Sequence, residues 1–84
     1  MNKLNPAKYN LHPRIKLLGK DNNIFILIDR KSRIIMKDGY RIVEIAKRIS
    51  KIDAKKEIFV LSNAPICGKT QNFLSDKGIA VKVF

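Results

Sequence analysis

The stretch IFILIDRKSRIIMKDGYRIVEIAKRISKI, residues 24–52, contains the change of pattern that decides the fold. It begins with an unbroken apolar run, Ile24 to Ile28, which is typical of a strand buried on both faces. The segment DRKSR (29–33) interrupts this run, and residues 34–36 are apolar again, so we predict a hairpin of two strands. From Asp38, a predicted N-cap, the apolar residues recur every three or four positions, which indicates an amphipathic helix. Its apolar stripe consists of Ile42, Ile45, Ala46, Ile49 and Ile52.

Further elements follow on both sides of this stretch. Residues 14–18 alternate and predict an edge strand, which turn residues separate from the central run. Downstream we predict a strand at 57–61, a two-turn helix at 70–77 that ends at Gly78, and a last strand at 79–84. The fold class is therefore α/β, a small sandwich of order β-β-β-α-β-α-β. A β-hairpin, or three antiparallel strands, precedes two right-handed βαβ units.

The length of 84 residues fits one domain, which buries roughly 60–65% of its unfolded surface. Residues 1–13 contain two prolines and three asparagines, and we expect an irregular N-terminal arm there. We expect residues 14–84 to form the single α/β domain.

The composition indicates a folded, cytoplasmic protein. Hydrophobic residues make up 45% of the chain and charged residues 30%. No apolar run approaches the roughly 20 residues of a membrane-spanning helix, and the N-terminus lacks the apolar stretch of a secretory signal. The single cysteine cannot form an internal disulfide, which fits a reducing compartment. We therefore expect no membrane association.

The charge is strongly positive and unevenly distributed. The chain has 18 Lys and Arg residues against 7 Asp and Glu residues. Residues 1–56 carry 15 of the basic and 5 of the acidic side chains. Basic domains attract polyanions, because each neutralised phosphate releases counterions. We expect nucleic acid or another polyanion as a partner.

Five cations lie within twelve residues around the predicted hairpin, and further cations lie on the polar face of the following helix. Such a cluster can follow a phosphate backbone. The alternative is that these charges are simply solvated. Tyr40 is the only aromatic residue nearby, which disfavours a stacking platform for single strands. The predicted nucleic-acid-binding residues are Arg30, Lys31, Arg33, Lys37, Arg41, Lys47 and Arg48.

The segment LSNAPICGKT, residues 61–70, connects a predicted strand to a predicted helix and ends like a phosphate-binding loop. Asn63 stands where that motif has its first glycine, and Pro65 removes one backbone donor. We therefore predict a looser anion site rather than nucleotide hydrolysis. The predicted anion- or ligand-binding residues are Asn63, Cys67, Gly68, Lys69 and Thr70.

Cys67 is also a candidate reactive thiol, because a helix N-terminus and a nearby lysine lower a thiol pKa. Its surroundings, PICGKT, resemble the single-cysteine glutaredoxin motif, although the following helix is about one turn shorter. The alternative is a small, partly buried cysteine. The sequence contains no group of Cys and His residues that indicates zinc, so we predict neither a metal nor a cofactor.

The segment ICGKTQNFLSDKGIAV, residues 66–81, resembles the C-terminal loop, helix and strand of the dinitrogenase iron-molybdenum cofactor accessory family. Cys67, Gly68 and Thr70 replace the Gly, Pro and Ala of that family's loop. The resemblance implies a ribonuclease H-like fold and, by analogy, a carrier of an anionic cluster or cofactor. The residues in register are Ile66, Leu74, Gly78, Ile79 and Val81.

Three functions remain open at this level. The leading hypothesis is a non-catalytic module that binds nucleic acid through the basic hairpin and helix face. The second is a small-anion, cofactor or thiol site in the loop 62–70. The third is a subunit of a larger assembly, including a homo-oligomer, because the sheet edges of so short a chain need covering.

Overall fold

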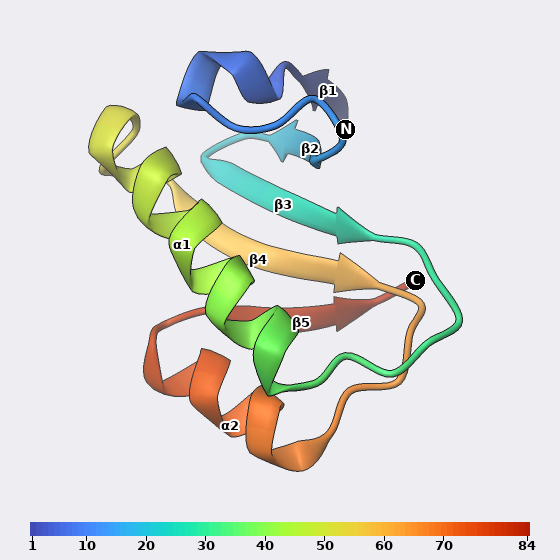
Figure 1. The fold of residues 1–84 in the computed structure, drawn as a ribbon. Coiled ribbons are helices and arrows are strands. Elements are labelled where there is room, and N and C mark those ends of the chain that lie inside the picture. Colours follow the sequence, from blue (N-terminus) through green and yellow to red (C-terminus); the bar gives the residue numbers. More distant parts are fainter.

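The protein folds into five strands, two α-helices and one short 3-10 helix, as shown in Figure 1 for the computed structural model, which describes residues 1–84. In chain order they are β1 (Asn2–Leu4), η1 (Pro6–Tyr9), β2 (Lys16–Lys20), β3 (Asn23–Ile28), α1 (Met36–Ile52), β4 (Glu57–Ser62), α2 (Gly68–Asp76) and β5 (Ala80–Val83). The strands form one mixed sheet of order β1-β2-β3-β4-β5. β1, β2 and β3 pair antiparallel, whereas β3, β4 and β5 pair in parallel. The α/β class and the element order predicted from the sequence are confirmed.

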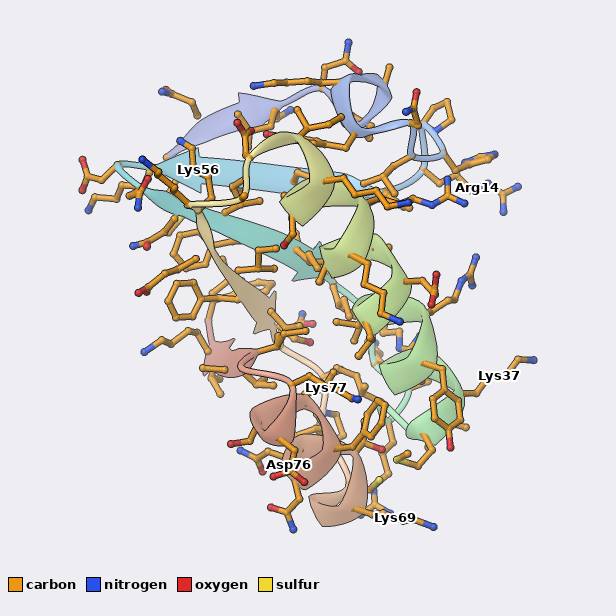
Figure 2. The ribbon with its side chains drawn as sticks, turned by 90° about the vertical axis from the view of Figure 1, so that its left-hand side faces the viewer. Arg14, Lys37, Lys56, Lys69, Asp76 and Lys77 are labelled. Carbon is orange, nitrogen blue, oxygen red and sulfur yellow. The ribbon has the colours of Figure 1, made fainter.

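Both α-helices lie on one face of the sheet. The unit β3-α1-β4 and the unit β4-α2-β5 advance in the same direction across the sheet, so crossovers of the same hand place α1 and α2 together. The two helices pack closely where Gly39 of α1 faces Thr70 of α2. A side chain at position 39 would not fit without a shift, because its Cβ atom would lie 3.0 Å from Cγ2 of Thr70. Figure 2 shows α1 on the right of the sheet and no helix on its left. The opposite face is therefore covered by side chains only.

The core lies between the sheet and α1. Leu17, Ile26 and Val60 form one buried row across the central strands. The apolar stripe of α1 packs onto this layer, because its period of three to four residues keeps the stripe on one side of the helix. Of the predicted stripe, Ile52 is 47% exposed because it is the last residue of the helix. Ile42, Ala46 and Ile49 are buried, and Ile45 is half-buried.

The predicted hairpin of residues 24–28 and 34–36 does not form. Ile34 makes only an isolated parallel bridge to Ile66, and α1 has already begun at Met36. β3 has no free edge for a third strand, because β2 and β4 occupy both sides. The hairpin instead joins β2 to β3 through a turn in which Asp21 adopts a left-handed φ of 54°. Arg30, Lys31 and Arg33 therefore lie in a strand-to-helix loop.

Asp38 is not the N-cap of α1, because the helix begins two residues earlier, at Met36. Its carboxylate instead accepts a hydrogen bond from the backbone N–H of Ile35, at 2.8 Å. It thus satisfies one of the free donors at the helix start from within the first turn. The predicted end of α2 is confirmed, since Gly78 has a φ of 77° just after the helix.

Residues 1–13, where we expected an irregular arm, contain β1 and η1. Tyr9 is buried at the end of η1, and its hydroxyl donates a hydrogen bond to the carboxylate of Asp53 just beyond α1. Nη1 of Arg48 donates to the backbone oxygen of Asn10, at 2.8 Å. These contacts attach the N-terminal segment to α1.

Candidate nucleic-acid interface

The carboxyl edge of the parallel strands brings the two predicted site segments together. Residues 29–35 follow β3, residues 63–67 follow β4, and the two loops are joined by main-chain hydrogen bonds. Ile34 N–H donates to the oxygen of Pro65 at 2.8 Å, and Cys67 N–H donates to the oxygen of Ile34 at 3.2 Å. The basic segment and the LSNAPICGKT loop are therefore neighbours.

Four of the five N–H donors of the Arg30 guanidinium are engaged, by Asp38 in the first turn of α1 and by the backbone of its own loop. It forms a bidentate ion pair with Asp38, with N···O distances of 3.1 and 2.6 Å. It also donates to the backbone oxygens of Ser32, at 3.2 Å, and Arg33, at 3.1 Å. This pairing lowers the pKa of Asp38, an effect that partial burial opposes and the Ile35 N–H supports. Arg30 thus holds the loop closed, and only one N–H of its Nη1 atom is left for a phosphate.

Asn63 links the two loops through its side chain. Its amide oxygen accepts from the backbone N–H of Arg30 at 3.0 Å, and its amide nitrogen donates to Asp29 at 2.7 Å. The neighbouring Ser62 is buried, and its hydroxyl donates to the oxygen of Ile28, at 2.8 Å. The polar atoms of Asn63 are therefore engaged in closing the sheet edge.

Cys67 caps α2. Its Sγ atom lies 2.8 Å from Oγ1 of Thr70 and accepts from the Thr70 N–H at 3.4 Å. These two hydrogen bonds, with a smaller effect of the nearby Arg33 charge, lower the pKa of the Cys67 thiol, whereas desolvation opposes them. Thr70 is completely buried and Cys67 is half-buried, so Asn63, Gly68 and Lys69 are the exposed members of the predicted anion-binding set.

The outer face of α1 carries the other predicted cations. Lys37, Arg41 and Arg48 recur along it at helical spacing and are exposed, and Lys51 continues the row. We call these four residues the basic ridge. Glu44 is the one acid in the row, and Lys47 pairs with it at 3.6 Å. No carboxylate lies within ion-pair distance of any ridge cation, since the three ion pairs of the protein involve Lys8, Arg30 and Lys47.

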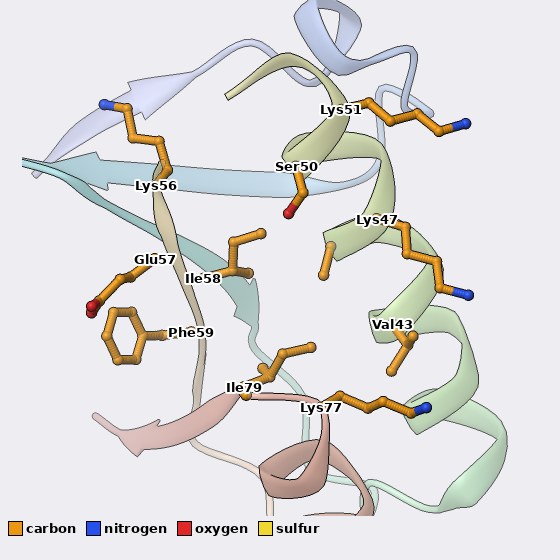
Figure 3. Close-up of a pocket in the computed structure, with 12 residues that line it drawn as sticks. Val43, Lys47, Ser50, Lys51, Lys56, Glu57, Ile58, Phe59, Lys77 and Ile79 are labelled. Atoms are coloured by element: carbon orange, nitrogen blue, oxygen red, sulfur yellow. The ribbon is translucent and has the colours of Figure 1, made fainter. Parts of the chain in front are cut away.

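A groove lies on each flank of the basic ridge. The first, of about 790 Å³, lies between the second half of α1 and the beginnings of β4 and β5 (Figure 3). Its floor is apolar, and Figure 3 shows Lys47, Lys51 and Lys77 extending away from the sheet along its border. Its charged lining residues are Lys47, Lys51, Lys56, Lys77 and Glu57.

The second groove, of about 300 Å³, lies between the first half of α1 and the β2-β3 hairpin. Arg14 reaches it from the segment before β2, and Figure 2 shows Arg14 and Lys37 pointing outward on the same side of the molecule. Its single acid, Asp38, is already paired with Arg30. Its charged lining residues are Arg14, Lys16, Arg30, Arg41 and Asp38.

Sequence reasoning missed the groove residues that come from distant segments. Arg14 approaches α1 because it precedes β2, which pairs with β3, and Lys77 does so because α2 packs beside α1. Lys16 borders the groove at the sheet, but the alternation of β2 directs its side chain to the opposite face. The alternation of polar and apolar residues at 14–17 was the one available signal, but it does not say which helix those residues approach.

Comparisons with known proteins add no assignment to this geometry. No family model, curated protein or solved structure matches the chain. Within the structure, no helix combines the length and the hydropathy needed to cross a membrane. No group of three or more His, Cys, Asp or Glu side chains is placed to hold a metal ion.

Proposed function

We propose that the protein binds nucleic acid through the helical side of the molecule. The observation that carries this proposal is the basic ridge on α1 with a cation-lined groove on each flank. The first groove has four cations and one acid among its lining residues. In the second, Arg14 and Arg41 are the available cations. Arg30 is paired with Asp38, and the side chain of Lys16 belongs to the opposite face of the sheet. A polyanion that follows α1 therefore meets positive charge from the ridge and from both borders.

The ridge has the right length for several phosphate contacts. A helix of 17 residues is about 25 Å long, and phosphates along one strand of DNA are spaced about 3.4 Å along the helix axis. Lys37, Arg41 and Lys51 carry the leading role in this proposal, because they have no carboxylate partner. Arg48 also lacks a carboxylate partner, but its guanidinium donates to the backbone oxygen of Asn10. Arg30 is a structural residue of the loop in this proposal, because four of its five N–H donors are already engaged.

The test is a salt titration of binding to duplex DNA, duplex RNA and single-stranded DNA of unrelated sequence. The variant is Lys37→Ala/Arg41→Ala/Lys51→Ala. The matched control, Lys3→Ala/Lys20→Ala/Lys82→Ala, loses the same charge from the strands of the sheet. We expect the slope of log K against log salt to fall by about 3 in the ridge variant and to stay unchanged in the control, because each phosphate contact contributes about 0.9. Equal losses in both variants would show that only net charge attracts the polyanion.

A second candidate function is a small-anion or thiol site at the start of α2. It is favoured by the lowered pKa of Cys67, the exposed Lys69 and the nearby Arg33. Lys69→Ala and Cys67→Ser test it, because they leave the basic ridge intact. Loss of binding to inorganic phosphate in Lys69→Ala, or loss of thiol reactivity without loss of nucleic-acid binding, would separate this candidate from the first.

A further inference from the structure

The face of the sheet opposite the helices has an apolar centre. Because side chains alternate along a strand, the register places Leu18, Phe25 and Phe59 in one row on this face. Leu27 and Leu61 form the next row. Figure 3 shows Phe59 on the other side of β4 from Ile58, which points toward α1. None of these five residues belongs to the hydrophobic core under the helices.

These five residues, which we call the open face, form a cluster of their own. The rings of Phe25 and Phe59 stack with centroids 5.2 Å apart and an interplanar angle of 22°. Four of the five residues remain partly exposed, and Phe25 is buried among its neighbours. Two-layer folds bury one face of a sheet, and an apolar cluster on the other face marks an interaction surface.

The border of the open face is positively charged. The register places Lys3 beside Leu18, and Lys16 and Lys82 at the two ends of the leucine row. The ammonium of Lys82 lies 5.6 Å from the centroid of the Phe59 ring. Glu57 is the one acid within the five strands, and Lys20 lies at the other end of its row. The open face thus combines an apolar centre with a lysine border.

We propose that the open face docks a partner protein whose contact surface has an apolar centre and a border of carboxylates. Charge complementarity is the argument, because interfaces bury their apolar centre and pair opposite charges around it. A second copy of this chain would place one lysine border against another, and like charges at an interface are costly. The lysine border of the open face points away from the basic ridge. A protein on the open face and nucleic acid on the basic ridge can therefore bind at the same time.

Nucleic acid fits the open face less well than a protein does. Base stacking requires a free aromatic face. Phe25 is only 8% exposed, and Phe59 is covered on one side by Phe25 and approached by Lys82. The proposal is therefore independent of nucleic-acid binding by the helical side.

The experiment places a photo-cross-linking phenylalanine analogue at Phe59 in the cells that make the protein. The same analogue at Tyr40, an exposed aromatic residue of α1, is the matched control. We expect a product with one other protein from position 59 and not from position 40. The partner is then purified, and its affinity is measured for the wild type and for Lys20→Glu/Lys82→Glu. We expect at least tenfold weaker binding of this variant, and weaker binding of the wild type at high salt.

Three results would overturn the proposal. The first is a cross-linked product that contains nucleic acid or a second copy of this chain. The second is the absence of any specific product. The third is a purified partner that binds the Lys20→Glu/Lys82→Glu variant as tightly as the wild type. If the variant at Phe59 fails to fold, the analogue at Lys82 gives the same test, because that side chain is exposed beside the ring. Unchanged duplex binding by the Lys20→Glu/Lys82→Glu variant would keep this outcome separate from the function of the helical side.

Discussion

The loops after β3 and β4 close the same edge of the sheet, but they are held by different chemistry. The loop 29–35 depends on a charge pair, in which Arg30 binds Asp38 and the backbone of its own loop. The loop 63–67 depends on hydrogen bonds of three uncharged side chains, Ser62, Asn63 and Cys67, and one of these bonds, from Asn63, ends on the carboxylate of Asp29. The stability of the first loop should therefore depend on pH and on the charges of Arg30 and Asp38. The stability of the second loop should depend on individual uncharged side chains.

The largest expected effect on stability comes from Ile34 and Ile66, whose backbones form the isolated bridge between the two loops. Ile34 is completely buried, whereas its partner Ile66 is half-buried. We expect Ile34→Ala to lower the free energy of unfolding by about 3 kcal/mol, because the change leaves a cavity in the core. Ile66→Ala should cost about 1 kcal/mol, because less of its surface leaves water. Urea denaturation measures both, and equal losses would show that the loops contribute equally to the core.

The next two variants each remove the side chain whose hydrogen bonds hold one of the loops. Arg30→Ala deletes the bidentate pair and leaves Asp38, whose side chain is 20% exposed, without its partner. We expect a loss of about 2 kcal/mol. Asn63→Ala should cost about 0.5–1 kcal/mol, because water can replace its exposed hydrogen bonds. Thermal denaturation of the two variants checks this order, and a larger loss in Asn63→Ala would reverse the comparison.

The misplaced hairpin shows what the sequence can and cannot predict about this edge. The apolar run of β3 and the stripe of α1 were predicted because their periods are local properties of the chain. Ile34 continued an apolar pattern, but its backbone pairs with Ile66, a residue 32 positions away in the sequence. Local patterns do not distinguish a buried loop residue from a strand residue. For the same reason, Arg30 was predicted as a phosphate contact although Asp38 binds it.

A third prediction uses pH to separate the loops. The folded-state pKa of Asp38 is lowered, so the native state favours its ionised form. The stability that it contributes is complete above its unfolded pKa and is lost as the pH falls through the folded pKa. We expect the difference in unfolding free energy between the wild type and Arg30→Ala to shrink in acid below about pH 4. The difference between the wild type and Ser62→Ala should not change in this way, because the Ser62 hydroxyl bonds only the backbone oxygen of Ile28 and the N–H of Ala64. A constant difference for Arg30→Ala would exclude an ionised Asp38 as its partner.

The smallest effect concerns reactivity rather than stability, and it tests the second loop alone. Thr70 supplies the hydroxyl that contributes most to the lowered pKa of Cys67. Thr70→Val keeps the buried shape and the backbone N–H but removes this hydroxyl, so the pKa of Cys67 should rise toward its ordinary value. Less thiolate is then present near neutral pH, and alkylation by iodoacetamide becomes slower. Arg33→Ala should shift the pH–rate profile in the same direction but by less, because the charge of Arg33 is a weaker cause than the Thr70 hydrogen bonds. If Arg33→Ala had the larger effect, the thiol of the second loop would depend on charge from the first, and the two loops would act as one site.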